Sequence, residues 1–213
     1  MHATIAARGI SSFCALALAL LLASCGGGSG GGDPAIPTYT VGGTVSGLAG
    51  TGLVLQNNGV DNLAVSATGP FTATTALAGG VAYSVSVLTQ PTNPNQTCTV
   101  TNGTGTVSAA VTNVAVNCVT NTYRIGGTVS GLGGTGLVLR DNGGDNLPVL
   151  ANGTFTFTTP VASGAAYSVT VFTPPTNLSQ TCTVTNGSGT VVAADVTNVS
   201  VSCATNTFTV GGT

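Results

Sequence analysis

Cysteine, aspartate and arginine are the side chains through which this chain could do chemistry, and all three are scarce. Charged residues make up 4% of the 213 residues, with neither Lys nor Glu among them. The single histidine, His2, lies in a segment that we expect to be removed on export. No imidazole then remains to activate the many Ser and Thr hydroxyls, which excludes a Ser-His-Asp site. We therefore expect no catalytic residue and no enzymatic activity.

Four cysteines occupy matching places in a repeated sequence, at Cys98 and Cys118 and again at Cys182 and Cys203. An exported protein lies in an oxidising compartment, and two strands joined by a hairpin can bring thiols to bonding distance. We predict the disulfides Cys98–Cys118 and Cys182–Cys203. The alternative is a redox or metal pair, but these cysteines are not spaced as Cys-x-x-Cys. Pairing between the repeats is the other arrangement that the sequence allows.

Asp141 and Asp145 can be read as paired carboxylates, and residues 140–146 have a weak likeness to a calcium-binding loop. Calcium takes six to eight oxygen ligands, usually with several carboxylates among them. The first repeat has Asn57 and Asp61 at these places, so the carboxylate pair is not repeated. We interpret the segment as a turn whose Asx side chains bond its own backbone, with a calcium site as the alternative. No metal and no cofactor are expected.

Basic residues are too few for a nucleic-acid partner. Outside the expected leader only Arg124 and Arg140 are basic, against five aspartates in the whole chain. A nucleic-acid-binding protein needs clustered Lys and Arg to displace counterions from phosphate. We expect no nucleic acid among the partners.

The elements that would position these residues belong to an internal repeat. The motif that starts at Tyr39 returns at Tyr123, 84 residues later, and begins again at Phe208. Such a period indicates tandem modules. We expect residues 208–213 to be the start of a truncated third repeat.

The two complete repeats, 39–122 and 123–207, are identical at 59 of 84 positions when Asp195 is treated as an insertion. They must share a fold. Their Val and Thr residues favour strands, and alternating apolar positions predict an all-β fold in which each repeat is an antiparallel two-sheet sandwich of seven or eight short strands. In the second repeat these strands lie at roughly 124–130, 136–140, 146–150, 154–158, 167–172, 181–185 and 196–203.

Asn-Gly pairs separate several of these expected strands. Asn152-Gly153 and Asn186-Gly187 follow this pattern in the second repeat, and Asn102-Gly103 matches the latter pair in the first. Because Asn-Gly favours tight turns between paired strands, we predict hairpins at these places.

The N-terminal segment has the composition of an export signal. Arg8 precedes an apolar run from Phe13 to Ala23, which is shorter than the roughly 20 residues that a membrane-spanning helix needs. Leu22-Ala23-Ser24-Cys25 resembles the lipobox of bacterial lipoproteins, in which the leader is cut before the cysteine and the new N-terminus is acylated. The alternative is an ordinary signal peptide with an incidental Cys25.

This resemblance implies a signal peptide at residues 1–24, lipidation of Cys25, and the membrane as a partner through the anchor. Several acyl chains give durable attachment. Gly26 rather than Asp after the cysteine implies the outer membrane. Residues 25–38 are the lipidated cysteine and a Gly-rich linker, which we expect to be flexible.

The strand pattern, carried by residues 152–157 and 164–171, also resembles prealbumin-like and CnaB-like Ig-type modules of bacterial surface proteins. The array with its paired cysteines resembles tandem repeats of bacterial envelope lipoproteins. The Lys-Asn isopeptide bond of CnaB-type modules cannot form here, because the chain has no Lys.

Taken together, these features predict a non-enzymatic, lipid-anchored cell-envelope protein whose disulfide-stapled repeats act as a stalk or spacer. Two alternatives stay open. The repeats are an adhesion or glycan-binding module with a protein or glycan partner still to be identified, or they are accessory to a longer protein with a distal functional domain.

Overall fold

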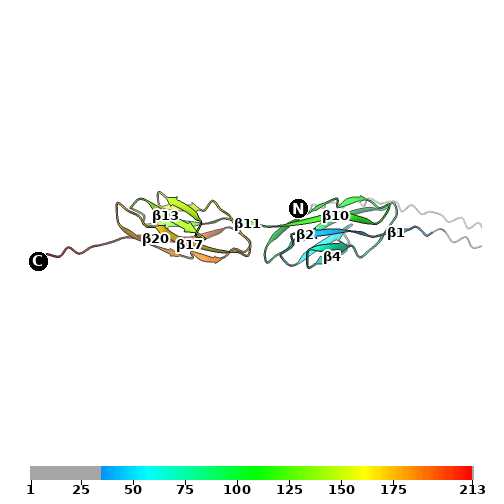
Figure 1. The fold of residues 1–213 in the computed structure, drawn as a ribbon, viewed down its shortest axis with the longest axis horizontal. Coiled ribbons are helices and arrows are strands. Elements are labelled where there is room, and N and C mark those ends of the chain that lie inside the picture. Colours follow the sequence, from blue (N-terminus) through cyan, green and yellow to red (C-terminus); the bar gives the residue numbers. More distant parts are fainter. Residues whose placement is uncertain (1–34, 213) are drawn as a thin grey trace, which may run out of the picture. The chain divides into compact units, whose positions relative to one another are not determined.

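The computed structural model describes residues 35–212, and in this part of the chain every regular element is a β-strand (Figure 1). The strands form two successive sandwiches, one for each repeat, which confirms the predicted all-β fold class. Val and Thr are the commonest residues of these strands, and their branched side chains fit the pleated surface of a sheet.

The first sandwich contains two four-stranded sheets, in the orders β5-β2-β10-β8 and β4-β3-β7-β9, and a two-stranded ribbon, β1-β6. Its strands are β1 (Thr38–Tyr39), β2 (Val41–Ser46), β3 (Leu53–Asn57), β4 (Asp61–Val65), β5 (Gly69–Thr72), β6 (Leu77–Ala78), β7 (Ala82–Thr89), β8 (Gln96–Thr101), β9 (Thr104–Thr106) and β10 (Val111–Thr120).

The second sandwich repeats this topology, with sheets β15-β12-β20-β18 and β14-β13-β17-β19 and the ribbon β11-β16. Its strands are β11 (Thr122–Tyr123), β12 (Ile125–Ser130), β13 (Leu137–Asp141), β14 (Asp145–Val149), β15 (Gly153–Thr156), β16 (Val161–Ala162), β17 (Ala166–Thr173), β18 (Gln180–Thr185), β19 (Ser188–Thr190) and β20 (Val196–Thr205).

Each sandwich has its own hydrophobic core between its two sheets. In the second sandwich Phe155 and Phe157 are both buried and meet edge to face, with ring centroids 5.8 Å apart. The same face of β17 buries Tyr167 and Val169, as the period-two alternation of the sequence predicted. The first sandwich buries a separate, matching set of Val, Leu and aromatic residues.

A parallel pair of strands joins the start of each sandwich to its end, so the sheets are not purely antiparallel. β2 pairs with β10 in parallel and β12 pairs with β20 in the same way, each with a shift in register. Gly43 and Gly127 lie beside these shifts. A Cβ at Gly43 would lie 1.7 Å from Val114 O, and one at Gly127 would lie 1.8 Å from Val199 O. The repeated Gly-Gly of the motif is therefore required by close backbone contact.

The Asn-Gly pairs do not form the predicted hairpins. Asn152-Gly153 lies between β14 and β15, and Asn186-Gly187 between β18 and β19, but the members of each pair of strands belong to different sheets. These two segments, and Asn102-Gly103 in the first repeat, cross from one sheet to the other. Asn102 and Asn186 have positive φ, a conformation that Asn tolerates better than most residues.

One residue, Asn121, separates the last strand of the first sandwich from the first strand of the second. Its N–H donates to Asn95 O over 2.9 Å, and its carbonyl oxygen accepts from Ser163 N over 2.8 Å. Both the N–H and the C=O of Asn121 are therefore hydrogen-bonded within the protein, whereas the backbone of a flexible linker is hydrated.

Candidate functional site

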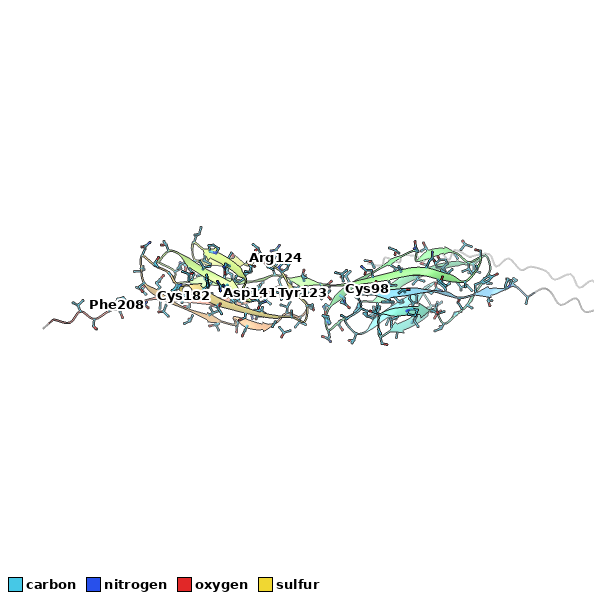
Figure 2. The ribbon with its side chains drawn as sticks, viewed as in Figure 1. Cys98, Tyr123, Arg124, Asp141, Cys182 and Phe208 are labelled. Carbon is cyan, nitrogen blue, oxygen red and sulfur yellow. A yellow bond between two sulfur atoms is a disulfide. The ribbon has the colours of Figure 1, made fainter. Side chains whose placement is uncertain are left out.

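The two disulfides link the same pair of strands in each sandwich. Cys98 of β8 bonds Cys118 of β10, and Cys182 of β18 bonds Cys203 of β20, with S–S distances of 2.03 Å. Figure 2 labels Cys98 and Cys182, one in each sandwich. The bonded strands are antiparallel neighbours but not a hairpin, because β9 or β19 lies between them in the sequence and in the opposite sheet.

A buried glutamine two residues before the first cysteine of each pair holds a loop in place. Gln180 is 4% exposed, and its Oε1 accepts hydrogen bonds from Gly133 N and Gly134 N, each over 2.8 Å. Its Nε2 donates to Gly131 O over 2.8 Å and to Thr205 Oγ1 over 3.4 Å. All four bonds recur around Gln96. These glutamines were not among the residues singled out from the sequence.

The carboxylates of Asp141 and Asp145 lie on paired positions of the β13–β14 hairpin but serve different backbone groups. Asp141 is 2% exposed, and its Oδ1 accepts from Ser168 N over 2.9 Å. Asp145 Oδ2 accepts from Thr159 N over 2.8 Å. The predicted turn is present, but its carboxylates bind backbone groups of β17 and of the loop after β15, so the expectation that they bond the turn's own backbone was wrong. Within residues 35–212 no three His, Cys, Asp or Glu side chains are placed to hold a metal ion.

Asp61, the counterpart of Asp145, caps the segment that follows β5. Its carboxylate accepts hydrogen bonds from Thr74 Oγ1 and, over 2.8 Å, from Thr75 N. The hydrogen bond from the Thr74 hydroxyl, followed by that from the Thr75 backbone, lowers the pKa of Asp61 below its ordinary value. Bonds of this kind favour the ionised form because they are made to the carboxylate.

Arg124 and Asp195, both peculiar to the second repeat, lie together beside a hollow of about 190 Å³ on the outer side of β12. Asp195 Oδ1 accepts from Arg124 N over 2.8 Å, and Arg124 Nη1 donates to two carbonyl oxygens, of Phe157 and Thr158. The hollow is lined mainly by threonines and by the backbone of Gly126 and Gly127. It contains no acid–base pair aimed at a common point.

Aromatic side chains offer little platform for a ligand in the described residues. Tyr83 and Tyr167 are 8% and 7% exposed and belong to the cores. Phe172 is 50% exposed, but the Arg140 guanidinium lies 3.2 Å from its ring centroid and covers one face. Figure 2 shows Phe208 on the extended segment after β20, where 79% of the residue is exposed.

Some of the residues named from the sequence lie outside the described part of the chain. These are the predicted signal peptide, Cys25 and most of the predicted linker. Within residues 35–212, no helix has the length and apolar character needed to cross a membrane. Residues 208–212, the expected start of a third repeat, are described but form no strand.

Comparisons with known proteins give no family. No protein-family model matches the chain, and no curated protein matches it. Among solved structures, the chain is similar to the major pilin protein T-13 of Streptococcus pyogenes serotype GAS131465. The identity is 10%, the match covers 78% of this chain and 95% of the pilin chain, and the TM-score is 0.22. A likeness this weak supports no inference about function.

Proposed function

We propose that the chain is a non-enzymatic, lipid-anchored protein of the cell envelope, with sandwiches that act as a stalk or spacer above an outer membrane. The observation that supports this most directly is the construction of the connection. A single residue joins the two sandwiches, and each sandwich is stapled by its own disulfide. In a tandem array each unit contacts only its neighbours, so added units lengthen the array.

The chemistry of the described surface fits this role. Threonine, serine and asparagine supply the polar faces, and the few ionised side chains are used on the protein's own backbone, as at Asp61, Asp145 and Arg124. The anchor is the part of the proposal that depends on sequence alone, through the likeness of Leu22-Ala23-Ser24-Cys25 to a lipobox.

Adhesion or glycan binding is the second candidate, but no observation favours it over the spacer. Sugar sites commonly use an exposed aromatic face, and the tyrosines at the core positions are buried. A glycan array and a pull-down with the full chain test this candidate. A reproducible ligand that is lost on substitution of surface residues would replace the spacer proposal.

The anchor is tested by Cys25→Ser. We expect the wild-type chain to fractionate with membranes and to resist extraction by high salt, since acyl chains hold it by burial of CH₂ groups. The Cys25→Ser variant should lose acylation, detected as the absence of the diacylglycerol mass on the N-terminal peptide. Cys14→Ser, a change within the leader, is the matched control and should leave acylation unchanged. A Cys25→Ser protein that retains the lipid mass would contradict the proposal.

A further inference from the structure

Strands β8 and β18 have the same sequence, Gln-Thr-Cys-Thr-Val-Thr, and the same place at the edge of a four-stranded sheet. Each pairs with one neighbour only, β10 or β20. With six residues, no proline and no charge, they lack the features that usually protect a sheet edge from pairing with another chain. What lies beside the edge therefore decides whether it is open.

The cysteines fix which backbone groups point outward from these edges. Cys98 lies opposite Cys118, and Cys182 opposite Cys203, with Cα–Cα distances of 3.9 Å. Such a short distance marks the pair type in which the two residues do not bond each other's backbone. The N–H and C=O groups of Cys98 and Cys182 consequently point away from the partner strand, out of the sheet.

In the first sandwich these outward groups are closed by the side chain of Gln90. Cys98 N donates to Gln90 Oε1 over 2.7 Å, and Gln90 Nε2 donates to Cys98 O over 3.1 Å. Gln96 N, the next outward donor, is bonded to Pro91 O over 3.2 Å. The carboxamide of Gln90 thus does what the peptide group of a further strand would do.

The second sandwich has Pro174 where the first has Gln90, and proline has no side-chain donor or acceptor. Among residues 35–212 nothing bonds the outward N–H and C=O of Cys182. Cys182 is half-buried, whereas Cys98 is only 4% exposed. The two strands have the same sequence, but the segments beside them differ at three places, with Gln90, Pro94 and Asn95 in the first sandwich and Pro174, Leu178 and Ser179 in the second. Of these, only Gln90 bonds the outward groups of the cysteine.

We propose that the outer edge of β18 is a self-association site, where β18 of a second copy of this chain pairs with it antiparallel. About a two-fold axis at Cys182, the two Cys182 residues exchange N–H···O=C bonds. The outward groups of one strand then satisfy those of the other, as an isologous contact requires.

A second copy suits this edge because β18 is self-complementary. Thr181 and Thr183 are exposed on the same face, and in this register Thr181 of one copy lies opposite Thr183 of the other, a favourable cross-strand pair. With no ionised group in the strand, like charges do not oppose the contact. A contact of one strand with another is small, so the dimer is weak and depends on concentration.

The test measures self-association of the full chain by sedimentation equilibrium over a concentration series. All variants carry Cys25→Ser to remove the proposed lipid, and a non-ionic detergent shields the leader. Pro174→Gln should close the edge as Gln90 does and weaken dimerisation about tenfold or more, since two hydrogen bonds are lost to the intramolecular amide. Gln90→Pro should open β8 and give species larger than a dimer.

Hydrogen exchange provides a readout on the edge itself. In dilute protein the Cys182 amide should exchange faster than the Cys98 amide, and it should slow as the protein concentration rises. In Pro174→Gln it should be slow at every concentration. A wild-type chain that associates no more strongly than Pro174→Gln, or a Cys182 amide as protected as that of Cys98 in dilute protein, would overturn the proposal. Neither outcome depends on whether Cys25 is acylated.

Discussion

At the scale of single residues, a buried glutamine in each sandwich holds a loop in place. Gln96 and Gln180 are almost fully buried, and every polar atom of their side chains is hydrogen-bonded. Glutamine is usually exposed, so composition alone places it on the surface. The available signal was its recurrence two residues before a cysteine in both repeats. Neutral, fully satisfied polar groups suit a chain with so few ions.

Gln180→Ala should lower the free energy of unfolding of the second sandwich by about 3 kcal/mol. The substitution leaves the N–H groups of Gly133 and Gly134 without their acceptor, and buried unpaired donors are costly. Denaturant unfolding followed by circular dichroism measures the loss. Thr197→Ala, at an exposed position of β20, is the control and should change stability by no more than about 0.5 kcal/mol. Equal losses in the two variants would contradict this prediction.

Asp61 should make the first sandwich less stable in acid. Its folded pKa is lowered by the Thr74 hydroxyl and the Thr75 N–H, so its carboxylate stabilises the fold above the unfolded pKa. That stabilisation is lost as the pH falls through the folded pKa. Asp61→Asn should therefore be less stable than the wild type near pH 7, with the difference shrinking below about pH 4.

Unfolding free energies measured from pH 7 to pH 2 test this dependence. Thr74→Val removes the largest cause of the lowered pKa and should flatten the profile in the same way. A wild-type profile parallel to that of Asp61→Asn across the whole range would show that the carboxylate contributes nothing to the pH dependence.

At the scale of elements, the sequence predicts where the strands lie better than it predicts which strands pair with one another. The alternation in 154–158 and 167–172 places Phe155, Phe157 and Tyr167 on the buried face, as observed. The hairpins predicted at the Asn-Gly pairs were wrong, because residues that tolerate the αL conformation occur both in hairpins and in segments that cross between sheets. Which of the two forms depends on where the next strand finds a partner, and that is decided by contacts far apart in the chain. The two-residue strands β6 and β16 carry no period at all.

The disulfides should act on their own sandwich only. Replacing Cys98 and Cys118 together by Ala frees a loop of 20 residues, which should lower the stability of the first sandwich by about 3 kcal/mol. The second sandwich has a separate core and should keep its stability. Peptide-resolved hydrogen exchange distinguishes the two. Replacing Cys182 and Cys203 is the reciprocal control, and a loss shared equally by both sandwiches would contradict the division into modules 39–122 and 123–207.

At the scale of the whole molecule, the period of 84 residues was the most informative feature of the sequence. It predicted two copies of one fold, and the structure confirms two sandwiches with the same topology. The proposed association site at the edge of β18 was harder to predict, because it depends on a difference between the two repeats and not on a motif. The replacement of Gln90 by Pro174 in the second repeat could not be interpreted from the sequence, because it matters only through the hydrogen bonds that Gln90 makes to the backbone of Cys98.

The parallel pairing of β2 with β10 and of β12 with β20 determines how a sandwich responds to mechanical tension. The chain enters a sandwich through β2 and leaves it through β10, so a pull on both ends slides the two strands past each other and loads their bonds together in shear. The disulfide between β8 and β10 then withholds the 20 residues from Cys98 to Cys118 from extension, roughly 70 Å of chain. Each sandwich is thus built to resist force in shear, and its disulfide keeps about a quarter of the 84-residue repeat from extending when it yields.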